Sequence, residues 1–197
     1  MTVRLRNIAT VSGGASFRSR IPASPSGNMR VIQMRDLGDD NLVHLDEAAR
    51  IELSDPKSGY LVRAGDIIFR SRGQTYTAAL LRENVSDTIV AAPLFLVRAN
   101  TNKVLPEYLL WWINQASSQS YLASAARGTA LKMISKQVLE DLEVSLPSLE
   151  EQSRVVRIFS LSSDEQQLLE ELKELRALYV HGILMQMASR PGQILPK

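Results

Sequence analysis

The chain contains no cysteine and only two histidines, His44 and His181, among its 197 residues. A disulfide framework is therefore excluded, and two histidines 137 positions apart cannot supply the usual Cys/His ligands of a zinc site. The N-terminus, MTVRLRNIAT, has no apolar signal core, and no run of about 18 apolar residues follows it. We therefore expect no metal site, no membrane span and a cytoplasmic location.

The sequence also lacks the common enzyme motifs. It has no G-x-x-x-x-G-K-[ST] phosphate loop, and its one glycine pair, Gly13-Gly14, has no third glycine at the spacing of a dinucleotide fingerprint. The Asn/Asp-Pro-Pro-aromatic signature of amino-methyltransferases and a G-x-S-x-G elbow are missing. The triplet at 171–173 is similar to a metal-holding Glu-x-Lys, but solvated neighbours on a helix explain it more simply. We expect no catalytic residue and no cofactor in this chain.

Positive charge is concentrated in two segments of the first half of the chain, although the net charge is only +2. Residues 1–35 contain six arginines and no acid, whereas residues 36–55 contain seven acids and one arginine. From Lys57 to Arg82 there are again five cations around the single acid Asp66. Arginine suits bidentate contact with phosphates and guanine edges, so these segments indicate a polyanion partner. The alternative is that they are solvated faces of strands and loops.

The first two thirds of the chain predict short strands separated by turns. Segments rich in Ile, Val and Phe and bounded by turn residues predict strands at 30–34, 67–70 and 89–97. The Gly65-Asp66 pair predicts a tight turn directly before the second of these strands.

Helical periodicity begins near residue 105. An amphipathic helix with Pro106 in its first turn is predicted by apolar residues at i, i+4, i+7, i+8 and i+11, which are Leu105, Leu109, Trp112, Ile113 and Ala116. Ser135 is placed to cap a second, short helix. Val144 and Leu146 then predict a brief strand that stops at Pro147.

A long helix is predicted from residue 148. Ser148 and Glu151 form a Ser-x-x-Glu capping box, and the pattern stays helical for about 40 residues, or roughly 60 Å. A heptad stripe, with Glu165 as its one polar member, consists of Ile158, Leu161, Leu168, Leu172, Leu175 and Tyr179. We expect a second molecule to cover this stripe in an antiparallel two-fold dimer. The alternative is a helical hairpin that turns at 160–164.

The predicted organisation therefore has three parts. A mixed α/β (α+β) domain occupies residues 1–147, a long coiled-coil helix occupies 148–190, and a flexible tail occupies 191–197.

Five segments, in this order, resemble one half of the DNA specificity subunit of type I restriction-modification systems. They are LVRAGDIIFRSRG at 61–73, PEYLLWWI at 106–113, ARGTALKMI at 126–134, LPSLEEQSRVV at 146–156 and HGILMQM at 181–187. In that family a target recognition domain and a long helix occur twice in one chain, and the two helices pair antiparallel. This sequence has one such unit and no internal repeat, so it resembles a half-length subunit.

The resemblance implies a fold, a function and partners. The domain at 1–147 would be a target recognition domain that binds double-stranded DNA. The homodimer, or a pair with a different half-chain, would read a two-part site and position methyltransferase (modification) subunits, together with restriction subunits where a system has them. Those subunits would carry the S-adenosylmethionine and ATP chemistry themselves.

The first group of candidate DNA contacts lies in 69–77. If this segment is extended, one face carries Arg70, Arg72, Gln74 and Tyr76. Arginine and glutamine there match guanine and adenine edges, respectively. The alternative is that Gly73 only turns a hairpin and that Tyr76 packs in the core.

Two further groups of candidate contacts lie in loops. Arg127, Thr129 and Lys132 form the second group, and their alternative role is that of a plain connection between helices. Arg18 and Arg20, beside a proline-rich loop, form the third.

Two other classes of function stay open at this level. One is a non-catalytic protein interaction scaffold with a degenerate recognition domain, in which neutralising Arg70, Arg72 and Arg127 leaves function intact. The other is a stand-alone enzyme on nucleic acid, in which Glu171→Ala abolishes metal-dependent cleavage.

Overall fold

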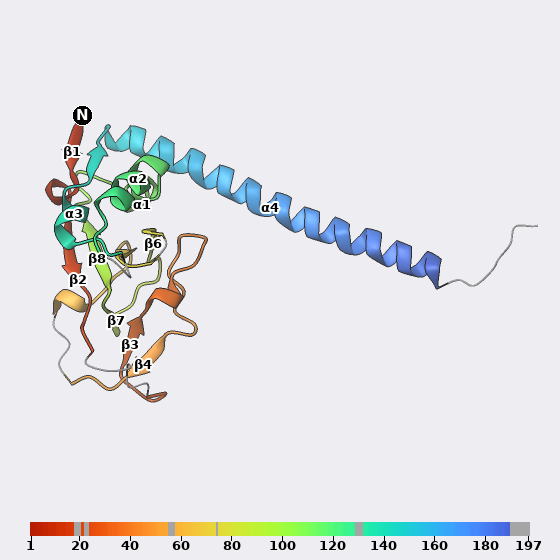
Figure 1. Ribbon diagram of the computed structural model, residues 1–197, viewed down its shortest axis with the longest axis horizontal. Coiled ribbons are helices and arrows are strands. Elements are labelled where there is room, and N and C mark those ends of the chain that lie inside the picture. The colour runs from red at the N-terminus through yellow and green to blue at the C-terminus, as the bar shows by residue number, and fades with distance from the viewer. Residues whose placement is uncertain (18–20, 22–23, 55–57, 74, 129–131, 190–197) are drawn as a thin grey trace, which may run out of the picture. The chain divides into compact units, whose positions relative to one another are not determined.

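The computed structural model of the chain describes residues 1–17, 21, 24–54, 58–73, 75–128 and 132–189. The chain divides into two compact units, Met1–Val156 and Arg157–Lys197. Strands and short helices form the first unit, and most of the long helix α4 forms the second (Figure 1). Short 3-10 helices in the first unit are η1, η2 and η3, at Leu5–Asn7, Met34–Asp36 and Ser58–Tyr60.

A four-stranded antiparallel sheet forms the centre of the first unit. Its order is β2–β8–β5–β6, with bounds Ala9–Gly13, Leu94–Ala99, Ile67–Arg70 and Ala78–Leu80. In β5, Ile67 and Phe69 point to one face and Ile68 to the other, and all three are fully buried. Both faces of the strand are therefore covered, which explains why its sequence is a continuous apolar run.

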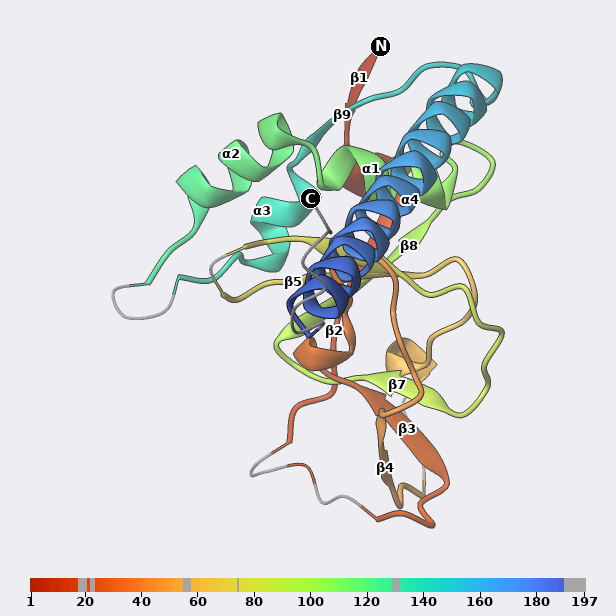
Figure 2. The same cartoon turned by 90° about the vertical axis from the view of Figure 1, so that its right-hand side faces the viewer.

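Two different layers cover the two faces of this sheet. On one face pack the helices α1, α2 and α3, at Pro106–Ile113, Ala116–Ala125 and Lys136–Glu140. On the other packs a three-stranded sheet of order β4–β3–β7, at Ala49–Ile51, Met29–Ile32 and Thr88–Val90, in which β3 and β7 are parallel. Figure 2 shows the three helices and the three strands at opposite ends of this unit. The predicted mixed α/β (α+β) class is confirmed.

Two of the predicted elements need correction. The segment 89–97 is not one strand, because β7 ends at Val90 in one sheet and β8 begins at Leu94 in the other. Pro93 lies between them and has no N–H for a sheet hydrogen bond. The helix predicted through Ala116 ends at Ile113, because the side chain of Asn114 instead binds the backbone N and O of Ala78 in β6, at 2.8 and 2.9 Å.

The Gly65-Asp66 turn before β5 is a buried ionic junction. Gly65 adopts a φ of +86°, which favours glycine. Asp66, 1% exposed, accepts a hydrogen bond from the Arg63 backbone N at 2.8 Å. Both of its carboxylate oxygens also accept bonds of 2.7 Å from the Arg98 guanidinium in β8, and this bonding raises the pKa of Arg98. The turn thus ties the start of β5 to its neighbouring strand.

The capping predictions at Ser135 and Ser148 are confirmed. The Ser135 hydroxyl accepts a bond of 3.3 Å from Val138 N at the start of α3. The backbone N of Ser148 donates to the Glu151 carboxylate at 3.0 Å, and Glu151 N donates to the Ser148 hydroxyl at 3.3 Å. These bonds lower the pKa of Glu151. Val144 lies in β9 (Glu143–Ser145), which pairs antiparallel with β1 (Thr2–Arg4).

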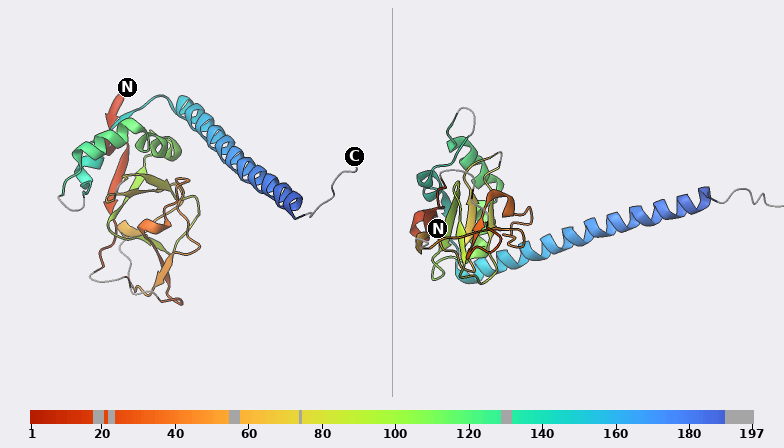
Figure 3. Two further views of the ribbon diagram at one scale, coloured as in Figure 1. Left: turned by 45° about the vertical axis from the view of Figure 1, so that its right-hand side comes forward. Right: turned by 90° about the horizontal axis from the view of Figure 1, so that it is seen from below.

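Helix α4 runs without interruption from Leu149 to Ala188, a length of 40 residues (Figure 3). It passes straight through residues 160–164, so the helical hairpin does not form. The predicted tail at 191–197 lies outside the described residues. In the described ranges, every helix is too short or too polar to cross a membrane.

The first turns of α4 are anchored by a fully buried glutamine, Gln152. Its Oε1 accepts a bond of 2.9 Å from Leu105 N, at the start of α1. Its Nε2 donates to Lys103 O at 3.1 Å and to Pro147 O at 2.9 Å. The amide therefore provides hydrogen-bond partners for three backbone groups from three different segments of the chain.

We predict that Gln152→Leu lowers the free energy of unfolding by about 2–4 kcal/mol, because it leaves those three backbone groups unpaired. Urea unfolding, followed by far-UV circular dichroism, measures the change. The control is Gln166→Leu, an exposed position of the same helix, for which we expect a change within about 0.5 kcal/mol. Equal stability of Gln152→Leu and the native chain would contradict this account.

Candidate nucleic-acid interface

Backbone pairing at the end of β5 brings together the first two groups of predicted DNA contacts. Ile134 N donates to Ser71 O at 2.8 Å, and Arg72 forms an antiparallel bridge with Met133. On its other side Met133 pairs with Arg127, through N–O bonds of 2.9 and 3.1 Å. Met133 thus lies between Arg72 and Arg127, which are 55 residues apart in the sequence.

The Arg70 and Arg72 side chains are half-buried, and their hydrogen-bond partners among the described residues are neutral. Arg70 Nη2 donates to the backbone O of Leu37, and Arg72 Nη2 lies 3.3 Å from the Met133 sulfur. The Nε atoms of both arginines are buried without a hydrogen-bond partner. Within the described part of the chain, neither guanidinium forms an ion pair with a carboxylate.

Six other arginines of the first unit form ion pairs with acids. Arg98 is paired with Asp66, and Arg30 and Arg50 both contact Asp87. The arginines near the N-terminus are also paired: Arg4 and Arg6 with Asp141, and Arg35 with Asp36. Four of the arginines at 1–35 therefore have an acid beside them in the folded chain, so the free positive charge of that segment is smaller than its count of arginines suggests.

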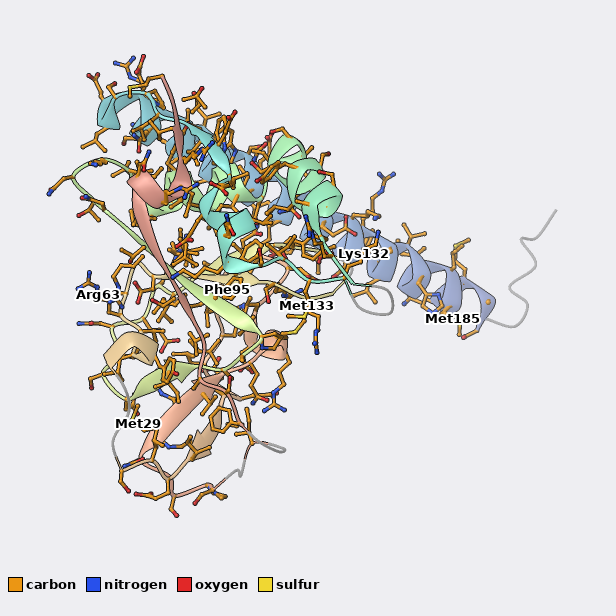
Figure 4. The ribbon with its side chains drawn as sticks, turned by 60° about the vertical axis from the view of Figure 1, so that its left-hand side comes forward. Met29, Arg63, Phe95, Lys132, Met133 and Met185 are labelled. Carbon is orange, nitrogen blue, oxygen red and sulfur yellow. The ribbon has the colours of Figure 1, made fainter. Side chains whose placement is uncertain are left out.

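Two exposed cations accompany the half-buried pair. Arg127 and Lys132 are both exposed, and the described acids form no ion pair with either. Figure 4 shows Lys132 beside Met133 and Arg63 well away from them. A desolvated guanidinium without a counter-ion is unfavourable, and nearby cations add to its field. The end of β5 therefore favours an anion from outside the chain.

Tyr76 does not share this surface. Its side chain is 4% exposed and packs in the core beneath the helices. Because β5 and β6 form an antiparallel hairpin, with Phe69 opposite Ala78, the segment 69–77 is not a continuous strand. The hypothesis of one extended face is wrong for Tyr76, and the part of the alternative that packs Tyr76 in the core is confirmed. The φ of Gly73 is +130°.

The remaining predicted contacts have no described placement. Gln74, Thr129, Arg18 and Arg20 lie outside the described residues.

Sequence reasoning missed two residues that build this region. Met133 joins the two arginine segments, and Ser71, 1% exposed, donates its hydroxyl to Pro93 O. Both lie inside segments that resemble the specificity-subunit family, 61–73 and 126–134, but the resemblance does not show which residues they contact, because those contacts join distant positions of the sequence.

The Glu-x-Lys triplet on α4 has an ordinary explanation. Glu171 accepts a bond of 3.0 Å from Gln167, and Lys173 pairs with Glu170 at 2.8 Å, all on an exposed helix face. Among the described residues, no three His, Asp or Glu side chains come together as metal ligands.

Comparisons with known proteins agree with this arrangement. The family model of the type I restriction modification DNA specificity domain matches residues 1–174. The type I restriction enzyme EcoBI specificity subunit of Escherichia coli is 28% identical over 130 residues, which are 66% of this chain and 27% of that protein.

Two solved structures show the same fold. The HsdS subunit from Thermoanaerobacter tengcongensis has a TM-score of 0.64 and 22% identity, with 100% of this chain and 51% of that chain covered. A chain from work on complex assembly and conformational transition of the type I R-M system has a TM-score of 0.67 and 20% identity, with 95% and 43% covered. This chain thus spans about half or less of the length of these relatives.

The paired arginines of the three-stranded sheet allow a test by pH. Arg30 donates to Asp87 at 2.9 Å, and this bond is the main reason why the pKa of Asp87 lies below its ordinary value of 3.8. A lowered pKa in the folded chain adds stability above the ordinary pKa, and that stability is lost as the pH falls through the lowered value.

We therefore predict that Asp87→Asn unfolds about 0.5–1 kcal/mol more easily at pH 7, and that the difference from the native chain shrinks towards pH 3. Urea unfolding at both pH values measures it, with Asp46→Asn, an exposed acid, as the control. A difference that stays constant between the two pH values would refute the ion pair as its cause.

Proposed function

Because this chain belongs to the type I restriction modification DNA specificity domain family, we propose that it is a half-length specificity subunit that recognises a sequence in double-stranded DNA. In this proposal residues 1–147 are the recognition domain, and the coiled coil is formed by the helix α4 that follows. The observation that carries the proposal is the pair of half-buried arginines, Arg70 and Arg72, without carboxylate partners among the described residues. Phosphates and guanine edges are the groups that such guanidiniums bind best.

The four cations at the end of β5 divide into two roles. Arg127 and Lys132 are exposed and free to reach phosphates, which fix the position of a protein on the duplex. Arg72 is held between backbone segments with its Nη2 beside Met133, so it has the restricted geometry that reading a base edge requires. Gln74, Thr129, Arg18 and Arg20 stay proposed contacts.

The function also requires a partner for the long helix. The six apolar residues of the predicted stripe are between 60 and 71% exposed in the single chain. We propose that a second copy covers them in an antiparallel homodimer, so that two recognition domains read the two parts of a split site. The dimer positions methyltransferase subunits, and restriction subunits where they are present. Those subunits carry the chemistry, and this chain contributes no catalytic residue or cofactor.

A salt titration tests the DNA contact. We predict that the logarithm of the association constant falls linearly with the logarithm of the salt concentration. In the variant Arg127→Gln/Lys132→Gln this salt dependence becomes weaker: the slope of the logarithmic plot becomes less negative by about 2, because about one unit is lost for each phosphate contact. Both side chains are exposed, so the variant keeps the fold. Fluorescence anisotropy with a labelled duplex measures both quantities.

The matched control is Arg63→Gln, which removes an exposed arginine elsewhere in the first unit (Figure 4). We expect its slope to equal that of the native chain. Binding that hardly responds to salt, or equal effects of the control and the double variant, would sink the DNA-binding proposal and favour a protein interaction scaffold.

A further inference from the structure

The exposed stripe of α4 contains one acid, and its position restricts how two helices can pair. A shallow groove of about 690 Å³ follows the stripe, and its lining includes the apolar Ile158, Leu161, Leu168 and Leu172, with Glu165 in the stripe and Asp164 beside it. Within α4 the ion pairs are Arg154–Glu150 and Lys173–Glu170. Glu165 and Arg176 belong to no ion pair among the described residues. An acid buried in an apolar seam needs a cation beside it.

The heptad assignment follows from the spacing. The a positions are Ile158, Glu165, Leu172 and Tyr179, and the d positions are Leu161, Leu168, Leu175 and Gly182. In an antiparallel pair each a residue faces a d residue of the second copy, and alternative registers differ by steps of seven residues. Three registers keep the stripes together: those in which Glu165 faces Leu168, Leu175 or Gly182.

Each register gives Glu165 a different hole of four residues, at i, i+3, i+4 and i+7 of the facing helix. In the register in which Glu165 faces Leu168, the hole is formed by Glu165, Leu168, Leu169 and Leu172 of the second copy. This register brings the Glu165 carboxylates of the two copies together. Facing Gly182, it is formed by Tyr179, Gly182, Ile183 and Gln186, which carry no charge. Facing Leu175, it is formed by Leu172, Leu175, Arg176 and Tyr179, so that a cation lies in the hole.

We propose that two copies of the chain pair through α4 in the register that places Glu165 of each copy against Arg176 of the other. The two-fold axis makes this ion pair occur twice. The inference rests on the dimer of the proposed function and adds the register that the dimer adopts.

The rest of the seam fits this register. Leu168 and Leu172 face each other in the two central layers, and Leu161 faces Tyr179. Ile158 faces Gly182, so a large side chain in that layer faces a residue without one. The 40-residue helices overlap over nearly their whole length. One contact in this register is unfavourable, because the like-charged Glu171 side chains of the two copies lie near each other at the edge of the seam. Water and salt screen this repulsion.

Charge reversal tests the ion pair. We expect Glu165→Arg and Arg176→Glu each to weaken dimerisation by about tenfold or more, measured by sedimentation equilibrium on the full chain. An equal mixture of the two variants should form a heterodimer about as tight as the native dimer, because each arginine then faces a glutamate. The control is Glu174→Arg, at an exposed position outside the seam, which should leave dimerisation unchanged. Single variants as tight as the native chain, or a mixture as weak as either variant, overturn the register.

Cysteine cross-linking tests the geometry independently, since the native chain has no cysteine. Leu161→Cys and Tyr179→Cys should form an interchain disulfide only when the two variants are mixed. In this register two copies of residue 161 lie about 27 Å apart along the helices, too far for Leu161→Cys alone to cross-link. Self-cross-linking of Leu161→Cys, or a mixture that does not cross-link, contradicts the inference.

DNA binding of the same samples separates the two proposals. A dimer in another register that still binds DNA with the expected salt dependence overturns the register alone. A chain that stays monomeric removes both the register and the dimer.

Discussion

Both faces of the central sheet are buried, and this determines where polar side chains can lie in the first unit. Because Ile67, Ile68 and Phe69 are fully covered, by helices on one side and by a second sheet on the other, β5 has no room for a polar side chain. Its polar groups begin at Arg70, where the strand ends. The segments that pair there, around Met133 and Arg127, belong to the connection between α2 and α3. The candidate site therefore lies where β5 leaves the space between the two covering layers, at Arg70.

The distribution of acids decides which arginines are available to a ligand. Asp66, Asp87 and Asp141 each hold one or two arginines in ion pairs that join strands or loops of the first unit. No such acid accompanies Arg70 or Arg72 among the described residues. Counting cations along the chain overestimates the free charge at 1–35, and only the fold distinguishes the structural arginines from the free ones.

Local signals in the sequence were sufficient for α4, for both serine caps and for β5. Each depends on residues within one or two turns of the chain or on an uninterrupted apolar run. The pairing of Met133 with two arginine segments and the burial of Tyr76 were not predictable, because they arise from contacts between distant segments. The alternation of polar side chains along 69–77 gave a wrong prediction for Tyr76 for the same reason. It assumes one continuous strand, whereas β5 ends at Arg70 and the chain returns in β6. Gln152 could be predicted only in part. It belongs to the segment 146–156 that resembles the family, but its three hydrogen bonds to backbone groups could not be predicted from the sequence.

If the end of β5 reads a base sequence and α4 sets the distance between two such readers, selection of bound duplexes from a random pool by the full chain should enrich a split motif. Its two halves should be inverted copies separated by one fixed gap. Recovery of duplexes without a shared motif would contradict sequence reading, and recovery of a single ungapped half-site would contradict the paired readers.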